Sequence, residues 1–494
     1  MCPCYFLNFG LRAQSIFFLY QQRCIDIIRR FIMGLFQKKN EHFFVKPSDA
    51  TVGQCFSKGN AITKLSFFIF GLGNILNKQI ARGLVFLAIE IGYIVYMATF
   101  GISTLVGFTT LGTATQEEVW DPNLGIFVYT DGDNSMLFLL YGVITIFITF
   151  AMIFFAMMSG KSAFATQYRK EKGMPIPTFR EDLRSATEEN LHVAMMAIPI
   201  VGVLVFTIAP LVFTILTAFT NYDSNHQPPG NLFTWVGFDN FIDLFSSNGR
   251  LAETFWPVLG WTLIWAVFAT FTCYLGGLVL ALLINRKGTR AKGFWRFMFV
   301  ISIAVPQFVT LLSMKTIFND NGPVNVFLQN AGIIDKPIFW FTDPTLARII
   351  IICVNFWIGV PFTMLSTTGI LQNIPGELYE AAKIDGANAM TIFWKITLPY
   401  MIFVMTPNLI TSFTGNINNF NVIYLLSGGG PQTVDYYFAG KTDLLVTWLY
   451  KLTIDRKDYN LGAVIGILTF IVLATVSLLT YRNTASYKDE GAFQ

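Results

Sequence analysis

Residues 257–284 read PVLGWTLIWAVFATFTCYLGGLVLALLI and contain no charged side chain. A helix crosses the hydrocarbon core of a bilayer with about 20 consecutive apolar residues, so this stretch is long enough to span a membrane. Its apolar residues run continuously, whereas the strands of a membrane β-barrel alternate apolar and polar positions. The stretch therefore predicts a transmembrane α-helix.

Seven further stretches of the 494-residue chain have the same character. The eight predicted spans are 83–104, 137–158, 193–219, 257–284, 295–315, 347–370, 399–426 and 461–481. Only 13% of the residues are charged, against roughly 25% in a soluble globular protein. So few charges cannot cover a soluble surface, which excludes a soluble enzyme, a nucleic-acid-binding protein and a disordered chain. We expect an all-α polytopic membrane protein with about eight transmembrane helices.

The loops between these spans differ in charge. Loop 159–192 carries six Lys or Arg residues and loop 285–296 carries five, whereas 105–136 carries none. The positive-inside rule then places 159–192, 285–296 and 371–398 in the cytoplasm, together with both termini. The last loop, 427–460, goes against this trend because it carries four basic residues: Lys441, Lys451, Arg456 and Lys457.

Three segments lie outside the predicted spans. Residues 1–61 are predicted to be a cytoplasmic N-terminal segment, and 482–494 a cytoplasmic tail. An ordinary cytoplasmic start, MGLFQKKNEH, begins at Met33, so residues 1–32 can be interpreted as an artefact of start-codon choice. Residues 62–80, ITKLSFFIFGLGNILNKQI, are apolar but short for a span, and we expect them to form a helix lying in the membrane interface.

Ionisable side chains are almost absent from the predicted spans, and Glu90 in the first span is the plain exception. We expect the Glu90 carboxylate to pair with a neighbour or to reach the interface, with a functional role as the alternative. Transporters driven by protons or sodium usually keep carboxylates or histidines inside the membrane. Uphill transport by this chain would therefore need another source of energy. The chain carries no ATPase motif, since Gly160-Lys161-Ser162 lacks the preceding strand and the spaced glycine of a phosphate-binding loop.

The seventh predicted span is rich in neutral polar residues. They are Asn408, Thr411, Ser412, Thr414, Asn416, Asn418, Asn419 and Asn421. Asn416 and Asn419 are three residues apart, which places both on one face of a continuous helix. Amides both donate and accept hydrogen bonds, as sugar hydroxyls do, so this face predicts a path for a neutral polyhydroxylated solute. Hydrogen bonding between helices is the alternative interpretation.

The segment after the sixth span carries the most specific pattern. It consists of Glu380, Ala381, Ala382 and Gly386, followed by Ile396, Thr397, Leu398 and Pro399. The spacing matches the Glu-Ala-Ala motif of ABC importer permeases without a departure. It predicts a short helix over 378–385, ended by Gly386, that docks in a cleft of a soluble partner, where Glu380 meets a basic residue. An ordinary amphipathic loop helix is the alternative.

Residues 62–482 further resemble the larger membrane subunit (MalF-type) of maltose/maltodextrin ABC transporters, a family of binding-protein-dependent sugar permeases. Two more stretches carry the likeness, NNFNVIYLLSGGGP at 418–431 and AGKTDLLV at 439–446. The resemblance implies a type I permease core. Its parts would be two accessory transmembrane helices within 83–158 and a six-helix core at 193–481 that includes the coupling loop 371–398.

The resemblance also implies sugar contacts on the sixth and seventh spans. The matching residues are Gly359, Ser412, Asn416 and Asn419, with Ile358 and Phe362 as conservative counterparts. Gly415 stands where the family's maltose subunit has an aromatic residue, which removes a surface for sugar stacking. The implied residues for coupling to an ATPase are Glu380, Ala381, Ala382 and Gly386. We predict no catalytic residue and no metal site.

We therefore expect a permease subunit of an ABC importer for maltose or maltodextrin, and not an enzyme, in the cytoplasmic membrane of a bacterium. The implied partners are a second permease subunit, two cytoplasmic ATPase subunits, an extracellular sugar-binding protein and membrane lipid, with no nucleic acid. ATP and Mg²⁺ would bind to the ATPase subunits, so this chain would hold no cofactor. The alternatives are an ABC permease for another oligosaccharide and a secondary sugar transporter.

Overall fold

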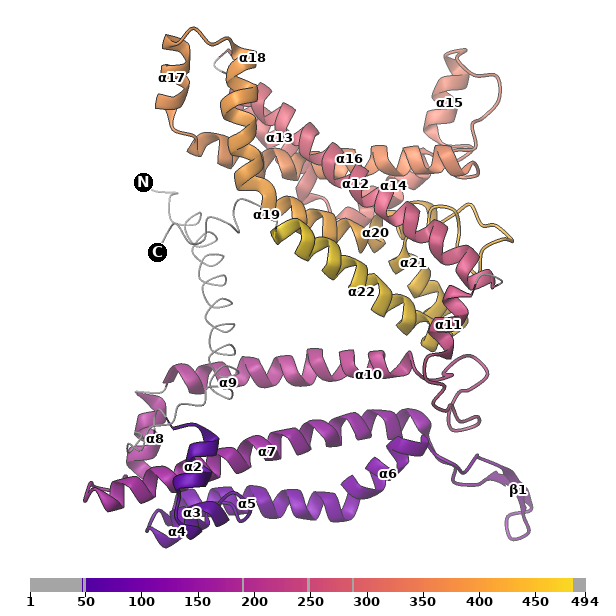
Figure 1. Cartoon of the computed structure of the whole chain (residues 1–494). Helices are drawn as coiled ribbons and strands as arrows, with labels where there is room; N and C mark the ends of the chain where they lie inside the picture. Colours follow the sequence, from indigo (N-terminus) through magenta and orange to yellow (C-terminus); the bar gives the residue numbers. More distant parts are fainter. Residues whose placement is uncertain (1–46, 48–49, 189–190, 247–248, 287, 483–494) are drawn as a thin grey trace. The chain divides into compact units, whose positions relative to one another are not determined.

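The computed structural model describes residues 47, 50–188, 191–246, 249–286 and 288–482, so most of the predicted N-terminal segment and nearly all of the tail lie outside the described residues. The chain forms two compact units (Figure 1). Unit 1 comprises Met1–Thr109 and Leu137–Pro210, and unit 2 comprises Thr110–Met136 and Leu211–Gln494. Both units are built from helices. Unit 2 also contains a two-stranded hairpin, formed by β1 (Glu118–Asp121) and β2 (Ile126–Tyr129).

Long apolar helices dominate both units. In the described part of the chain, seven helices are long and apolar enough to cross a membrane. A further pair of helices, bent relative to each other, brings the number to eight if the pair counts as one span. The seven run over Ile80–Thr110, Ser135–Glu171, Leu191–Thr217, Arg250–Asn285, Pro344–Asn373, Ala389–Ile417 and Tyr459–Arg482. The prediction of an all-α membrane fold with about eight helices is confirmed.

Unit 1 is built around two spans. The first contains α5 (Ile80–Tyr96), a π-helical turn η1 (Met97–Gly101) and α6 (Ile102–Thr110), and the second is α7 (Ser135–Glu171). Short helices precede and follow them: α2 (Val52–Lys58), α3 (Ala61–Leu65), α4 (Leu72–Leu76) and α8 (Phe179–Thr187). A third span, formed by α9 (Leu191–Val203), η2 (Leu204–Ile208) and α10 (Ala209–Thr217), starts in unit 1 and continues into unit 2.

The single helix predicted over 62–80 is wrong, because this segment folds as α3 and α4 with a turn between them. Gly71 has φ +76°, a left-handed conformation that only glycine adopts without strain. The turn is held by α7, since the hydroxyl of Ser159 accepts a hydrogen bond from the Gly71 N–H at 2.8 Å. Glu90 also serves this turn, because its carboxylate accepts the Phe70 N–H at 2.7 Å.

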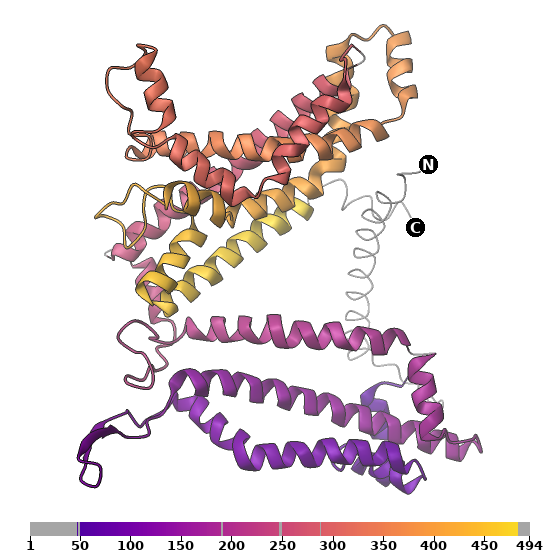
Figure 2. The same cartoon turned by 180° about the vertical axis from the view of Figure 1, so that it is seen from behind.

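Unit 2 centres on α12 (Arg250–Asn285), α16 (Pro344–Asn373) and α19 (Leu398–Ile417), with α22 (Tyr459–Arg482) beside α19. Its other helices are α11 (Asp239–Phe245), α13 (Lys292–Ala304), α14 (Gln307–Ile317), α15 (Pro323–Asn330), α17 (Gly376–Ile384), α18 (Ala389–Ile392), η3 (Phe393–Thr397), α20 (Phe420–Ser427), α21 (Leu445–Tyr450) and η4 (Lys451–Arg456). Within this unit, α15 and α17 lie at opposite ends of the α12–α16 pair (Figures 1 and 2).

Two predicted spans of unit 2 are broken helices. The predicted span 295–315 folds as α13 and α14, which meet at an angle of 89°. Pro306 causes this break, because it has no N–H to donate and it disfavours helical geometry at the residue before it, so Val305 is extended (φ −76°, ψ 126°). The predicted span 399–426 ends at Ile417, and a separate helix, α20, begins at Phe420.

The loop that goes against the charge trend, 427–460, is folded and engages three of its four basic residues internally. Lys451 donates to the Asp443 carboxylate at 2.6 Å, and both side chains are shielded from solvent. The Lys441 ammonium lies 3.7 Å from the centre of the Tyr436 ring, and the Arg456 guanidinium 4.3 Å from that of Phe438. These three cations are therefore used in the fold of the loop, which explains their presence against the trend.

Candidate functional site: a polar cavity between three helices

Small residues allow α12 and α16 to pack closely. A Cβ atom added at Gly359 of α16 would lie 2.6 Å from the Sγ of Cys273 of α12, and one added at Gly277 would lie 2.3 Å from the Thr363 hydroxyl. Thr363 in turn donates to the Cys273 carbonyl at 2.7 Å. Close approach of two helices through small residues is the usual way in which spans associate in lipid. Gly359 thus makes room for Cys273, a packing role separate from the sugar contact that the resemblance implies for it.

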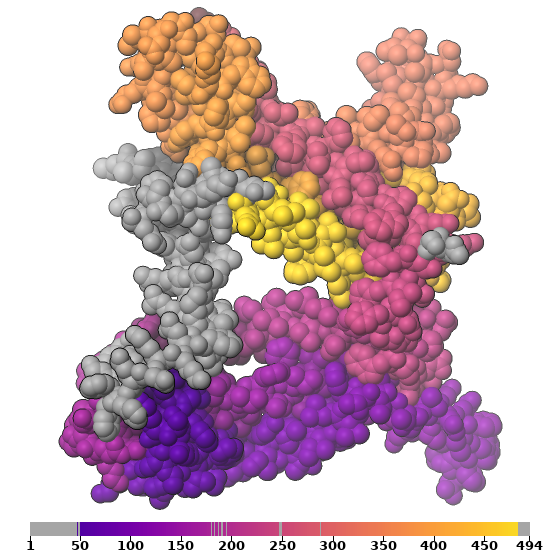
Figure 3. All heavy atoms as spheres, viewed as in Figure 1, coloured from indigo at the N-terminus to yellow at the C-terminus, as the bar shows by residue number. Residues whose placement is uncertain are grey.

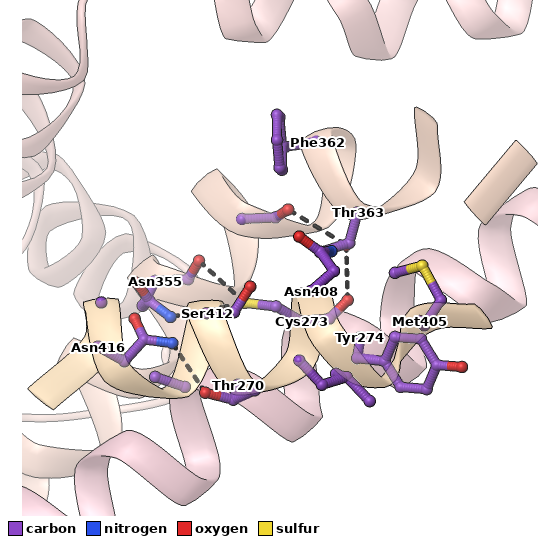
Figure 4. A pocket seen from close by; sticks show the side chains of 14 residues that line it. Thr270, Cys273, Tyr274, Asn355, Phe362, Thr363, Met405, Asn408, Ser412 and Asn416 are labelled. Carbon is purple, nitrogen blue, oxygen red and sulfur yellow. Dashed lines mark hydrogen bonds between the residues drawn. The ribbon is translucent and has the colours of Figure 1, made fainter. Parts of the chain in front are cut away.

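A cavity of about 240 Å³ lies where α12, α16 and α19 meet (Figure 4). None of its lining residues carries a charge. The lining residues are Ala269, Thr270, Cys273 and Tyr274 of α12, Asn355, Gly359, Phe362 and Thr363 of α16, and Met405, Asn408, Leu409, Ser412, Gly415 and Asn416 of α19. The cavity is smaller than the roughly 300–1,000 Å³ of pockets that enclose a whole drug-sized ligand.

The polar groups of the cavity fall into two sets. Asn416 and Asn355 are engaged: Asn416 donates to the Thr270 hydroxyl at 2.9 Å, and Asn355 contacts the Cys273 sulfur at 3.5 Å. Asn408 and Ser412 are half-buried, and their side chains have no hydrogen-bond partner among the described residues. These two are four residues apart on α19, so they share one helix face. The free amide and hydroxyl can therefore donate to and accept from a bound molecule.

Part of the cavity wall belongs to a buried hydrophobic cluster. Tyr274 and Met405 line the cavity and also belong to a buried cluster with Leu278, Ile374 and Met401. Ile374 caps the end of α16 and lies two residues before α17 begins, so this cluster lies between the cavity and α17. The Tyr274 hydroxyl is buried there and has no hydrogen-bond partner within the described ranges of the chain.

The structure brings four of the six sequence-predicted residues to the cavity: Gly359, Phe362, Ser412 and Asn416. Ile358 does not line it and packs beside the buried cluster that contains Trp261 and Leu311. Asn419 does not line it either, because the helix breaks before it. Its side-chain oxygen accepts the Val422 N–H at 3.3 Å and caps α20, while its amide donates to Asn416 at 3.3 Å.

Sequence reasoning listed Asn408 among the polar residues of the seventh span but did not select it as a sugar contact, and the structure places it in the lining of the cavity. The signal was present, since Asn408 precedes Ser412 by four residues. Thr270 and Asn355 were also missed, and the sequence gives no signal for them. A single threonine or asparagine in an apolar span is ordinary, and only the packing of α12, α16 and α19 brings these side chains to one place.

The segment predicted to dock on a partner forms α17, which stands out from the rest of unit 2 in the space-filling view (Figure 3). Gly386 ends the helix with φ +78°, and the Ala387 N–H returns to the Ala382 carbonyl at 2.9 Å in a Schellman-type cap. The helix is anchored on one side, where the Tyr379 hydroxyl meets that of Thr397 at 3.2 Å.

The free side of α17 carries exposed residues of two kinds. Glu380 and Ala381 are exposed, and Ala382 is half-buried. Ile384 is 86% exposed and Leu378 is 45% exposed. A short helix with one anchored side, exposed apolar residues and a free carboxylate has the surface of a helix that binds in a groove.

Several membrane-spanning helices around an uncharged polar cavity, with an exposed helix at one end, define a polytopic permease. Residues 274–485 match the family described as binding-protein-dependent transport system inner membrane components. The maltodextrin transport system permease protein MdxF of Bacillus subtilis is 35% identical to this chain, over 85% of it and 94% of MdxF. The chain therefore belongs to the binding-protein-dependent permeases of ABC importers, which are multi-span proteins of the bacterial cytoplasmic membrane.

Two further relatives differ in the solute that their names specify. The galactooligosaccharides permease GanP of Bacillus subtilis is 36% identical over 87% of this chain and 99% of GanP. The maltose/maltodextrin permease MalF of Escherichia coli is 36% identical, but over 54% of this chain and 52% of MalF. A solved structure of a bacterial ABC transporter for alginate aligns with 61% of this chain at a TM-score of 0.49 and 22% identity.

Proposed function

We propose that this chain forms the sugar path of an ABC importer for maltose or maltodextrin. The observation that carries the proposal is the uncharged cavity between α12, α16 and α19, with the free amide of Asn408 and the free hydroxyl of Ser412 on one helix face. A neutral sugar offers hydroxyls that donate and accept, which suits an amide and a hydroxyl better than charged groups. The maltodextrin permeases at 33–35% identity over most of the chain support this class of solute.

The cavity takes only part of an oligosaccharide, since its volume is about 240 Å³. We infer that a second permease subunit supplies the opposite wall. The exposed face of α17 would dock on one of two ATPase subunits, which would hold ATP and Mg²⁺. An extracellular binding protein would deliver the sugar to the opposite end of unit 2. In this arrangement α17 and both termini are cytoplasmic, and lipid surrounds the spans.

The cluster of Tyr274, Leu278, Ile374, Met401 and Met405 gives the path a gate. With the cluster packed, the cavity is closed toward the cytoplasm. Movement of α17 on ATPase closure would act on this cluster through Ile374, which lies two residues before α17, and through the contact of Tyr379 with Thr397. Alternating access then requires that the side chains of this cluster move apart when the two ATPase subunits open again.

Uptake into proteoliposomes tests the proposal. The complex would be reconstituted with ATP inside and the sugar-loaded binding protein outside, and uptake of labelled maltotriose would be compared with that of a galactooligosaccharide. We expect ATP-dependent maltotriose uptake that ionophores leave unchanged at constant ATP. Uptake of the galactooligosaccharide alone would favour the second candidate, which the similarity to GanP supports. Loss of uptake with ionophores at constant ATP would favour a secondary transporter.

A further inference from the structure

The loop between the first two spans of the chain folds as a β-hairpin with two different faces. In its register Glu118 pairs with Tyr129 and Trp120 with Phe127, while Val119 pairs with Val128 and Asp121 with Ile126. Directly opposite residues of an antiparallel pair lie on one face, so the first two pairs form what we call the aromatic face. The other two pairs form the aliphatic face.

The aromatic face is open to solvent in this chain. Trp120 is 50% exposed, Phe127 is 59% exposed and Tyr129 is 66% exposed. The rings of Trp120 and Phe127 meet edge to face with centroids 5.1 Å apart, so the face is pre-organised. A two-stranded hairpin alone is at best marginally stable in water and usually needs a third element to cover it. Large exposed aromatic groups with a fixed arrangement are typical anchors of protein interfaces.

The charge of the same loop limits what can cover this face. Segment 110–136 contains five carboxylates and no Lys, Arg or His: Glu117, Glu118, Asp121, Asp131 and Asp133. Asp133 fixes the base of the loop, because its carboxylate accepts the N–H groups of Thr113 and Ala114 at 2.7 and 3.0 Å. A net charge of −5 is repelled by anionic lipid and by a second copy of the same loop. The complementary occupant is a protein surface that combines apolar groups with Lys or Arg.

We propose that the aromatic face of this hairpin is a docking surface for the extracellular sugar-binding protein, which meets it with a basic, partly apolar patch. The inference rests on the proposed set of partners. The aromatic groups would supply most of the affinity, whereas the five carboxylates would steer the encounter and make it sensitive to salt.

The test compares two variants of the full importer complex in nanodiscs. Trp120→Ser with Phe127→Ser removes the aromatic face, and Val119→Ser with Ile126→Ser removes two exposed side chains from the aliphatic face as the matched control. Affinity for the sugar-loaded binding protein is measured by biolayer interferometry. We expect the aromatic-face variant to weaken Kd about tenfold or more, the control to stay within about twofold, and higher salt to slow association of the wild type.

Hydrogen exchange of residues 117–130 identifies what covers the hairpin. Protection that appears only when the binding protein is added supports the proposal. Protection already present in nanodiscs without the binding protein means that lipid or another subunit covers the hairpin, and it overturns the proposal. Equal Kd for wild type and the aromatic-face variant also overturns it. If the wild-type complex itself does not bind the binding protein, the proposed partner set fails, which is a distinct result.

Discussion

The side-chain amide of Asn416 donates a hydrogen bond to the hydroxyl of Thr270 at 2.9 Å, and this bond joins α19 to α12 across one wall of the cavity. The backbone carbonyl of Asn416 is engaged too, since it accepts the indole N–H of Trp265 at 3.0 Å. Asn416 therefore sets the spacing of two helices before it can contact a sugar. Its amide is a structural group as well as a part of the cavity.

This bond makes a prediction about stability. Asn416→Leu should lower the free energy of unfolding by about 1–3 kcal/mol, because it leaves a buried hydroxyl without its partner. Thr270→Val should lower it by a similar amount. The double variant should be less destabilised than the sum of the two, as measured by thermal unfolding of the purified protein. Strict additivity would show that the two side chains are not coupled.

Asn408 and Ser412 should matter for transport more than for stability. Their side chains line the cavity and have no hydrogen-bond partner in the part of the chain that the structure describes, so Asn408→Leu removes groups that are available to a bound sugar. Loss of about 1.4 kcal/mol of binding would reduce maltodextrin uptake about tenfold at subsaturating sugar. Thr411→Val is the control on the same helix, since its hydroxyl is bonded to the Pro407 carbonyl. An Asn408→Leu variant with wild-type uptake would exclude this face from the path.

The sequence was sufficient for α17 and for the number and approximate position of the spans, though not for the breaks in two of them, because span length and the α17 motif are local patterns. Apolar length predicts a span, and the Glu-Ala-Ala spacing with Gly386 predicts a short helix and its end. It was insufficient where two groups distant in the chain meet. A helix face was expected to hold Asn416 and Asn419 together, but the break at Asn418 makes Asn419 a cap. The engagement of Asn416 depends on Thr270, which lies 146 residues earlier.

The exposed side of α17 predicts how coupling can be disrupted. Ile384→Ser removes the most exposed apolar side chain of the helix, and Glu380→Lys reverses its free charge. Both should reduce co-purification of the ATPase and uptake, while the protein still inserts normally, because neither side chain is needed for packing within the chain. Lys383→Gln, at an exposed position of the same helix, is the control. Wild-type ATPase recovery with Glu380→Lys would refute the docking role of this helix.

Close packing at Gly359 predicts a rescue experiment. Gly359→Ala would place its Cβ 2.6 Å from the Cys273 sulfur, so α12 and α16 must separate or Cys273 must rotate. Overpacking of this kind typically costs about 1–3 kcal/mol. Cys273→Ala removes the sulfur and should restore much of the lost thermal stability in the double variant. If Gly359→Ala alone is as stable as wild type, the contact between the two helices is not tight at this point.

The buried pair of Asp443 and Lys451 predicts an asymmetry between single and double substitutions. The Asp443 carboxylate accepts both the Lys451 ammonium and the Gly440 N–H at 2.6 Å, and it is inaccessible to solvent. Removing one partner of a buried pair leaves an uncompensated charge and costs about 3–5 kcal/mol. Lys451→Met should therefore unfold at a clearly lower temperature than wild type.

Asp443→Asn combined with Lys451→Met removes both charges of this pair and leaves an amide that can still accept the Gly440 N–H. The double variant should recover most of the stability lost in Lys451→Met, because no unpaired charge stays buried. Lys457→Met is the control, since Lys457 is exposed in the same loop and should change the unfolding temperature little. The measurement is thermal unfolding of the purified protein followed by tryptophan fluorescence. A double variant as unstable as Lys451→Met would show that the ion pair itself, and not the avoidance of an unpaired charge, stabilises this loop.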